Sequence, residues 1–243
     1  MNIEELYRQI QEGKLSPEEF RRQVSLEYLD LAGKSVLDTR RELRTGIPEI
    51  IYAEYKTARQ TEDIARALYA EKGLVLISRS PHTDVLQERL ADIGPMHVSE
   101  HLLVVGTMPP PRGAVAVLSG GTADHPQAEE AALTLRALGV RPLVYEDRGI
   151  AHPTRVIDAL RSAMAEGPRA VIAIAGMEAS LATFVSSLVP LPVVGVPTSV
   201  GYGFKAGETA LYSMLASCTP NLTVVNINGG LRAAVVAALI AKA

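Results

Sequence analysis

The sequence predicts an α/β protein. Its C-terminal domain is expected to have three layers, with a five-stranded parallel sheet between helices, and its N-terminal domain is expected to be a smaller α/β unit. Beyond residue 113, five short apolar runs alternate with longer segments of helical pattern, which is typical of a parallel sheet. The apolar runs are nearly continuous, as strands covered by helices on both faces require. Consecutive prolines at 109–111 disfavour both helix and sheet, so we expect domains at 1–112 and 113–243.

The first domain is predicted to begin with two short helices. Apolar residues recur at helical spacing from Ile3 to Ile10, and Ser16-Pro17-Glu18-Glu19 has the form of a capping box with proline at the first helical position. A charged, irregular segment follows. Beyond it, the pattern predicts a small α/β unit with a strand at 49–52, a helix at 60–71, a strand at 74–77, a helix after Pro81 and a strand at 102–105.

The second domain is predicted to consist of five strand–helix units. We expect the strands at 114–118, 142–145, 170–174, 192–196 and 222–226, and the helices at 127–138, 154–165, 178–189, 207–216 and 230–241. This pattern predicts a flavodoxin-like sheet, in which ligands bind beyond the carboxyl ends of the strands. The loops that follow the strands are therefore expected to converge on one crevice.

Composition limits the classes of function. Lys plus Arg number 24 against 27 Asp plus Glu, and the net charge of -3 gives no electrostatic case for nucleic acid or an anionic membrane as partner. The N-terminus is acidic and amphipathic, unlike a signal peptide, and no apolar run is long enough to span a bilayer. We therefore expect a globular cytoplasmic protein with a small-molecule partner. The single cysteine, Cys218, excludes an internal disulfide.

The first carboxyl-end loop has the composition of a phosphate-binding turn and consists of Ser119, Gly120, Gly121, Thr122, Ala123 and Asp124. Glycine permits a tight turn, the N–H groups at the start of the next helix attract anions, and two hydroxyls add donors. The loop matches neither of the common glycine-rich nucleotide motifs, so its signal is weak by itself. Asp124 has two interpretations: it caps the helix before Pro126, or it holds a ribose hydroxyl or a metal ion.

Two later loops supply candidates for proton transfer. Glu178 follows Gly176 and Met177 after the third strand, in a stretch with few charges, and is either an acid–base group or a helix cap. His152 follows the second strand and is either a proton carrier or phosphate donor, or a structural residue. Both loops are expected at the same edge of the sheet as the phosphate-binding turn.

Cys218 lies in a loop that precedes the fifth strand. It is a candidate nucleophile, and a small buried hydrophobic residue is the alternative. The loop before a parallel strand lies at the opposite edge of the sheet from the loops after the strands. We therefore expect Cys218 far from the crevice within one subunit, and, if it is catalytic, in the site of a neighbouring subunit.

Three arginines, Arg40, Arg41 and Arg44, crowd around a turn that contains Gly46 and Pro48. They form either an anion-binding loop or a solvated helix face with acidic partners. The sequence alone favours the second interpretation.

The segment from about Ala114 to Ala241 resembles the aminoimidazole ribonucleotide carboxylase family of purine biosynthesis. The resemblance is carried by residues 119–124, 151–155, 173–178 and 195–197. In that family these segments are the phosphate loop, a segment with a catalytic histidine, and two loops that close the pocket. The chain departs from the family pattern after His152, at Met177-Glu178 and at Cys218-Thr219-Pro220.

Those departures, the arginine segment and the added N-terminal half make the whole chain resemble the LarB family, the pyridinium-3,5-biscarboxylic acid mononucleotide synthases of nickel-pincer cofactor assembly. The resemblance implies that carbon dioxide or bicarbonate carboxylates carbon 5 of the pyridinium ring of nicotinic acid adenine dinucleotide. It also implies hydrolysis of the phosphoanhydride with release of AMP, no tightly bound cofactor, and a homo-octamer. Mg²⁺ is one option for assisting the hydrolysis.

The resemblance gives each candidate residue an expected role. Thiolate addition by Cys218 would activate the ring, and Glu178 or His152 would transfer the proton. The arginines Arg40 and Arg44 would bind the AMP half. The ribose phosphate would be held by Ser119, Thr122 and Asp124, in a pocket lined by Gly120, Gly121, Gly176, Met177 and Pro197.

Two alternative functions belong to other classes. A true aminoimidazole ribonucleotide carboxylase fits the phosphate loop and His152 but does not account for Glu178, Cys218 or the added domain. A nucleotide sensor without catalytic activity would use the crevice only for binding.

Overall fold

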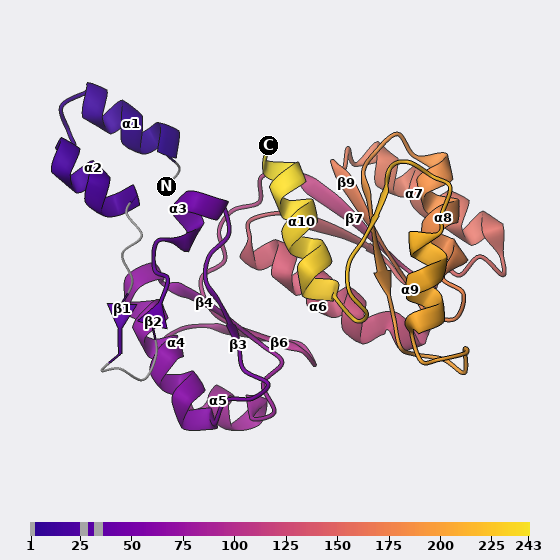
Figure 1. Cartoon of the computed structure of the whole chain (residues 1–243), viewed down its shortest axis with the longest axis horizontal. Coiled ribbons are helices and arrows are strands. Elements are labelled where there is room, and N and C mark those ends of the chain that lie inside the picture. Colours follow the sequence, from indigo (N-terminus) through magenta and orange to yellow (C-terminus); the bar gives the residue numbers. More distant parts are fainter. Residues whose placement is uncertain (1–2, 25–28, 32–35) are drawn as a thin grey trace. The chain divides into compact units, whose positions relative to one another are not determined.

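The computed structural model describes residues 3–24, 29–31 and 36–243. The described residues form two compact units, the first within residues 1–97 and 103–107 and the second within 98–102 and 108–243. Each unit combines helices with a sheet (Figure 1). Among the residues that the structure describes, every helix is too short or too polar to span a bilayer.

The first unit is built on a four-stranded sheet with the order β3-β4-β6-β5, and a separate two-stranded sheet pairs β1 with β2. The β3 and β4 strands run parallel, with Ile50 opposite Leu76. The elements of this unit are α1 (Ile3–Gln11), α2 (Pro17–Val24), β1 (Leu29–Asp30), β2 (Val36–Leu37), α3 (Arg41–Thr45), β3 (Ile50–Tyr52), α4 (Ala58–Lys72), β4 (Leu74–Ser78), α5 (Thr83–Arg89), β5 (Met96–Val98) and β6 (Leu102–Gly106).

Local signals account for the helix boundaries of the first unit. The predicted capping box at α2 is present, because Glu19 N–H donates to Ser16 Oγ and Ser16 N–H donates to the Glu19 carboxylate. A second capping box, between Thr57 and Gln60, begins α4. That helix ends at Gly73, whose φ of 68° is left-handed and favours glycine. The short elements α3, β1, β2 and β5 were not predicted from the sequence.

The second unit contains the expected five strands and five main helices. They are β7 (Ala114–Ser119), the short 3₁₀ turn η1 (Thr122–Asp124), α6 (His125–Ala137), β8 (Arg141–Tyr145), α7 (Pro153–Ala165), β9 (Ala170–Ala175), α8 (Ser180–Leu188), β10 (Val193–Pro197), α9 (Glu208–Leu215), β11 (Leu222–Val224) and α10 (Gly230–Lys242).

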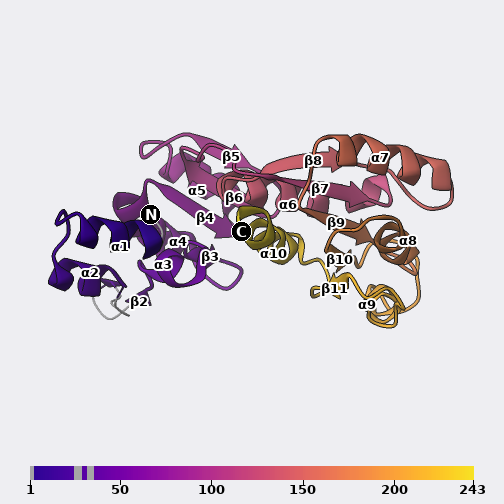
Figure 2. The same cartoon turned by 90° about the horizontal axis from the view of Figure 1, so that it is seen from above.

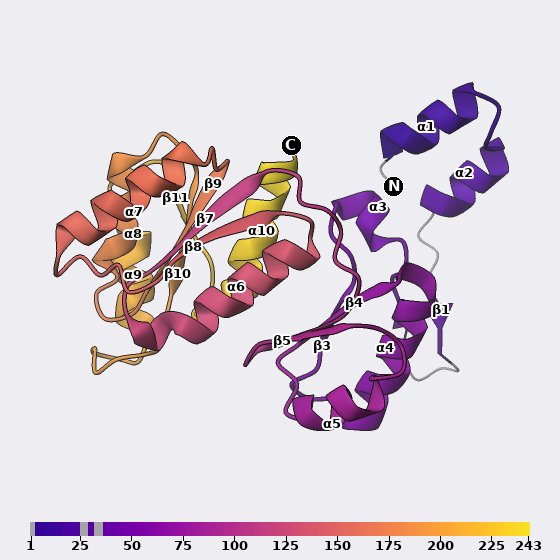
Figure 3. The ribbon, with the colours of Figure 1, turned by 180° about the vertical axis from the view of Figure 1, so that it is seen from behind.

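The five strands form a sheet with the order β11-β10-β9-β7-β8, and every neighbouring pair is parallel. The prediction of a three-layer, flavodoxin-like domain is therefore confirmed. Helices α6 and α10 lie on one face of the sheet and pack against each other, whereas α7, α8 and α9 lie on the other face (Figures 2 and 3). From β7 the chain continues to β8 on one side and then to β9 on the other. This reversal creates a switch point between β7 and β9, where ligands bind in such sheets.

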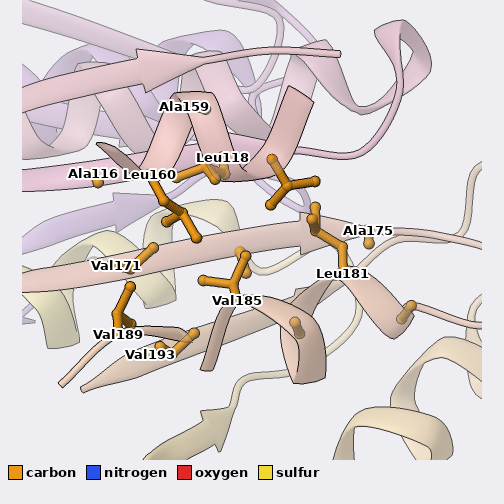
Figure 4. Packing of buried hydrophobic residues seen from close by; sticks show 14 of the residues in the cluster. Ala116, Leu118, Ala159, Leu160, Val171, Ala175, Leu181, Val185, Val189 and Val193 are labelled. Atoms are coloured by element: carbon orange, nitrogen blue, oxygen red, sulfur yellow. The ribbon is translucent and has the colours of Figure 1, made fainter. Parts of the chain in front are cut away.

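Alternation along the strands divides the core between the two faces. Leu118 and Val171 point to the face covered by α7, α8 and α9, where they pack with Leu160, Leu181 and Val185 (Figure 4). Burial of each such aliphatic side chain stabilises the folded state by about 1.5–3 kcal/mol relative to leaving it exposed. This packing fixes the strand ends from which the functional loops project.

One difference from the predicted boundaries affects a site loop. The helix expected at 178–189 begins two residues later, at Ser180. Met177 and Ala179 have φ values of 52° and 53°, which a continuing right-handed helix does not permit. Glu178 therefore lies in a turn before the helix.

Candidate active site

A cavity of about 310 Å³ opens at the switch point of the second unit. The loops after four neighbouring strands line it, as expected for the carboxyl edge of a parallel sheet. They contribute Gly120, Gly121, Ala123 and Asp124 after β7, residues 149–151 after β8, residues 175–181 after β9, and residues 200–201 after β10.

Asp124 is the most buried charged group of this cavity, with 5% of its surface exposed. Its Oδ1 accepts a hydrogen bond from the Thr198 hydroxyl at 2.7 Å, and its Oδ2 accepts one from Gly121 N–H at 2.9 Å. Burial raises the pKa of the Asp124 carboxyl, and these two hydrogen bonds lower it in part. Asp124 occupies the N-cap position of α6, but its side chain makes no cap hydrogen bond to that helix and bonds to Thr198 and Gly121 instead.

The turn after β7 uses two of its own amides internally. Gly120 N–H donates to the Ile174 carbonyl at 2.9 Å, and Gly121 N–H donates to Asp124. An incoming anion would have to share or displace the second of these bonds. Phosphate binding by this turn stays a prediction.

Glycine is required where loop backbones approach closely. A Cβ on Gly149 would lie 2.8 Å from the Gly120 carbonyl oxygen, and a Cβ on Gly176 would lie 2.8 Å from Thr198 Oγ1 and still closer to the Val200 carbonyl oxygen. Either substitution would force backbone apart at the cavity wall.

Three predicted binding residues lie close to the cavity without lining it. Ser119 is fully buried at the end of β7, and its Oγ has no partner among the described residues. Thr122 is exposed on η1, and Pro197 is buried as the last residue of β10. Of the predicted lining residues, the other four do line it: Gly120, Gly121, Gly176 and Met177.

Glu178 lies exposed on the cavity wall, and its Oε1 accepts a hydrogen bond from the Ser180 hydroxyl. The start of α8 has no side-chain cap, which argues against the helix-cap interpretation of Glu178. The left-handed residues on either side, Met177 and Ala179, direct this part of the chain away from helix geometry. A carboxylate at this position can exchange protons with a ligand in the cavity.

His152 lies beside the rim rather than in the wall. Its neighbour Ala151 lines the cavity, and the imidazole is exposed. The Nδ1 atom shares a hydrogen bond with Thr154 Oγ1 at 2.7 Å, which orients the ring at the start of α7. In the described structure, Glu178 is therefore better placed than His152 to reach the cavity.

Cys218 is exposed and lies in the connection between α9 and β11, at the amino edge of the sheet. Both neighbours are tied to α8: Ser217 Oγ accepts a bond from Thr183, and Thr219 Oγ1 shares one with Ser186 Oγ at 2.6 Å. Cys218 is not among the residues that line the cavity. The structure therefore places the thiol at the opposite edge of the sheet from the cavity, as the topology predicts.

The arginine segment belongs to the first unit and is largely paired with carboxylates. Arg44 forms a two-point ion pair with Asp38, and the Arg44 guanidinium lowers the pKa of that carboxyl. Arg41 lies 3.6 Å from the Glu49 carboxylate. In this geometry the segment is a solvated helix face with acidic partners, and Arg40 is the member without such an ion pair among the described residues.

Two site residues were missed by the sequence analysis. Thr198 is fully buried and bonds to Asp124, and Asn228 bonds to Ser199 beside it. Their position in carboxyl-end loops was the only available signal. Within the described residues, no group of three or more His, Cys, Asp or Glu side chains is arranged to hold a metal ion.

Comparison with known proteins identifies the family. A family model described as AIR carboxylase matches residues 114–243, and a LarB/PurE-like N-terminal domain matches residues 28–94. The chain belongs to the AIR carboxylase family. The family resemblance expected from the sequence, with the LarB type of N-terminal domain, is thereby confirmed.

Three individual proteins are similar to this chain. An uncharacterized protein of Methanocaldococcus jannaschii is 34% identical over 99% of this chain and 97% of its own length. An N5-carboxyaminoimidazole ribonucleotide mutase of Brucella melitensis is 35% identical over 53% of this chain and 78% of its own length. A crystal structure of a Treponema denticola PurE2 variant covers 53% of this chain and 79% of its own, at 28% identity and a TM-score of 0.45. Membership of the AIR carboxylase family supports a carboxylase-type function.

Proposed function

We propose that this chain carboxylates carbon 5 of the pyridinium ring of nicotinic acid adenine dinucleotide and hydrolyses its phosphoanhydride. The products are pyridinium-3,5-biscarboxylic acid mononucleotide and AMP. One observation carries the proposal: an AIR carboxylase domain that keeps the switch-point cavity has Glu178 in its wall, and it is joined to a LarB/PurE-like domain. The exposed Cys218 supplies the nucleophile that the ring chemistry needs.

The chemistry needs a nucleophile because a pyridinium ring is electron-poor. Addition of the Cys218 thiolate forms a C–S bond and gives an enamine-like ring whose carbon 5 is nucleophilic. That carbon forms a C–C bond with carbon dioxide. Loss of the carbon 5 proton and cleavage of the C–S bond then restore the aromatic ring and the thiolate, so no oxidant or reductant is needed.

The residues of the cavity divide the remaining work. Glu178 accepts the carbon 5 proton, with His152 at the rim as the alternative base. Asp124 accepts hydrogen bonds from ribose hydroxyls, and the turn of residues 119–122 holds the adjoining phosphate. Carbon dioxide or bicarbonate is the co-substrate. Arg40 contributes positive charge to the AMP half, whereas Arg44 would first have to leave Asp38.

The separation of the thiol from the cavity requires a second copy of the chain. Within one chain Cys218 and Glu178 lie at opposite edges of the sheet. A homo-oligomer, and in the LarB family a homo-octamer, can bring the amino edge of one copy to the carboxyl edge of another. The site therefore lies at a subunit interface.

The test is product analysis by mass spectrometry. The purified chain is incubated with nicotinic acid adenine dinucleotide and ¹³C-bicarbonate. We expect AMP together with a mononucleotide that carries one labelled carboxyl group. Absence of both products would contradict the proposal. Release of AMP without a mononucleotide that carries the labelled carboxyl group would also contradict it.

A second candidate, carboxylation of aminoimidazole ribonucleotide, is favoured by the match of residues 114–243 to the AIR carboxylase family. A substrate exchange separates the two. Consumption of aminoimidazole ribonucleotide with bicarbonate, and none of the dinucleotide, would select this alternative. Binding of either nucleotide without labelled product would select the sensor.

A further inference from the structure

Asn228 joins two loops at the carboxyl edge of the sheet. It lies in the connection between β11 and α10, and its backbone N–H donates to the Pro197 carbonyl at 2.8 Å. Its Oδ1 accepts from Ser199 N–H at 3.0 Å, and its Nδ2 donates to Ser199 Oγ at 2.8 Å. One asparagine therefore holds the residues on both sides of Thr198.

Thr198 connects the segment that Asn228 holds to the cavity. It is fully buried, its N–H donates to the Ala175 carbonyl at 3.0 Å, and its hydroxyl donates to Asp124. Two residues after Thr198, Val200 lines the cavity and places its carbonyl against Gly176. A displacement of Ser199 would also move Thr198 and Val200, because both are joined to it directly by peptide bonds.

The connection that carries Asn228 is itself fixed. Gly229 N–H donates to the Asn226 carbonyl at 3.0 Å. At the start of α10, Leu231 N–H donates to the carboxylate of Glu130, a fully buried residue of α6. The loop that carries Asn228 is thus supported by the sheet and by helices α6 and α10. Support of this kind can hold the groups of a site in the precise positions that catalysis requires.

We propose that Asn228 is a positioning residue of the cavity: it holds residues 197–199 so that the Thr198 hydroxyl meets Asp124 and the Val200 carbonyl closes over Gly176. Asn228 acts on a bound nucleotide through these groups. The proposal deepens the proposed function, since it assumes that the cavity takes the ribose part of a nucleotide.

The backbone of Asn228 explains why asparagine suits this position and which variants test it. Its φ of 56° is left-handed, a conformation that asparagine, aspartate and glycine adopt more readily than other residues. Asn228→Asp keeps an acceptor for Ser199 N–H, and the Ser199 hydroxyl can turn to donate to the second oxygen. Asn228→Gly keeps the backbone conformation and removes both side-chain bonds.

The experiment compares Asn228→Gly, Asn228→Asp and the unaltered full-length chain. Hydrogen exchange of the 198–200 segment is expected to be about tenfold faster in Asn228→Gly and close to the original rate in Asn228→Asp. Binding of nicotinic acid mononucleotide is expected to weaken at least about fivefold in Asn228→Gly. In a plot of affinity against pH, the acid limb, where affinity falls as pH falls, is expected to move to higher pH in this variant. In Asn228→Asp the acid limb should lie at the same pH as in the unaltered chain. A general loss of structure at position 228 would not predict this recovery.

Two results would overturn the positioning role: unchanged exchange in Asn228→Gly, or equal impairment of the glycine and aspartate variants. The failure of the proposed function looks different. If the unaltered chain binds no mononucleotide, the proposed function fails, and hydrogen exchange alone decides whether Asn228 holds residues 197–199.

Discussion

The two edges of the sheet in the second unit are built in different ways. At the carboxyl edge, four loops enclose a cavity, and Gly149 and Gly176 let their backbones touch. At the amino edge, hydroxyl groups tie the chain on both sides of Cys218 to α8 and leave the thiol exposed. The first edge is suited to enclose a ligand, whereas the second leaves the Cys218 sulfur accessible to another molecule.

The proposed chemistry therefore uses two surfaces, the cavity at the carboxyl edge and Cys218 at the amino edge, that one chain cannot bring together. Parallel strands place all their following loops at one edge and all their preceding loops at the other. A catalytic Cys218 therefore requires oligomerisation as part of the active site. The variants below separate the contributions of the two edges.

The largest effect is expected at the amino edge. Cys218→Ala should reduce formation of the carboxylated product to background, because the ring can no longer be activated, while binding of the dinucleotide persists. Product formation and binding are measured on the same preparation. Thr223→Ala, an exposed change on β11 nearby, is the matched control. Normal turnover by Cys218→Ala would exclude the covalent mechanism.

At the carboxyl edge, Glu178→Gln should lower kcat by about 10²–10⁴-fold, the usual contribution of a general base. The change keeps the size of the side chain and its bond to Ser180. Ser180→Ala removes only the donor to Glu178 and should leave kcat within a few-fold. If Glu178→Gln keeps the original kcat while Ser180→Ala lowers it, Glu178 acts as a structural partner of Ser180 and not as the base.

Residues of the cavity differ in how far the sequence could predict them. The strands and the loops at 119–124 and 175–178 follow from alternating apolar and helical patterns, whereas the switch point needed the strand order of the structure. Asp124 and Glu178 each had a local helix-capping alternative, which the sequence could not test. The left-handed residues 177 and 179, the bond from Thr198 and the absence of side-chain cap bonds at α6 and α8 come from the structure alone. Thr198 and Asn228 could not be identified, because their partners lie 74 and 29 residues away in the chain.

Thr198→Val tests the electrostatics of the cavity through pH. Burial raises the pKa of Asp124 and the Thr198 hydroxyl lowers it, so removing the hydroxyl should raise this pKa further. Binding that needs the ionised carboxylate is lost as pH falls through the pKa, and its acid limb should move to higher pH. Nucleotide affinity measured against pH checks this.

The control for that experiment is Thr198→Ser, which keeps a hydroxyl and should keep the original acid limb. Loss of the hydroxyl also leaves a buried acceptor without its donor, which costs about 1–3 kcal/mol of stability. An acid limb that stays in place in Thr198→Val, or that moves to lower pH, would contradict the assigned role of Asp124.

The smallest effect is expected outside the cavity, at the same edge. A hydrogen bond from His125 Nδ1 to Glu146 at 2.8 Å raises the pKa of this histidine. Glu146→Gln should lower that pKa, as measured by NMR titration, and Glu129→Gln should lower it less because Glu129 acts only through its charge. The stabilising contribution of the pair is present below the unfolded pKa and is lost as pH rises through the raised one. Because both side chains are solvent-accessible, the thermal midpoint should hardly change.

Mixing two inactive variants tests the division of the site between copies most directly. Cys218→Ala and Glu178→Gln chains are unfolded together, refolded as mixed oligomers and assayed for carboxylated product. Random pairing should restore both groups at about one quarter of the sites, with activity in that proportion. Mixed oligomers without activity, or a fully active monomer of the unaltered chain, would contradict a site built from the two edges of different copies.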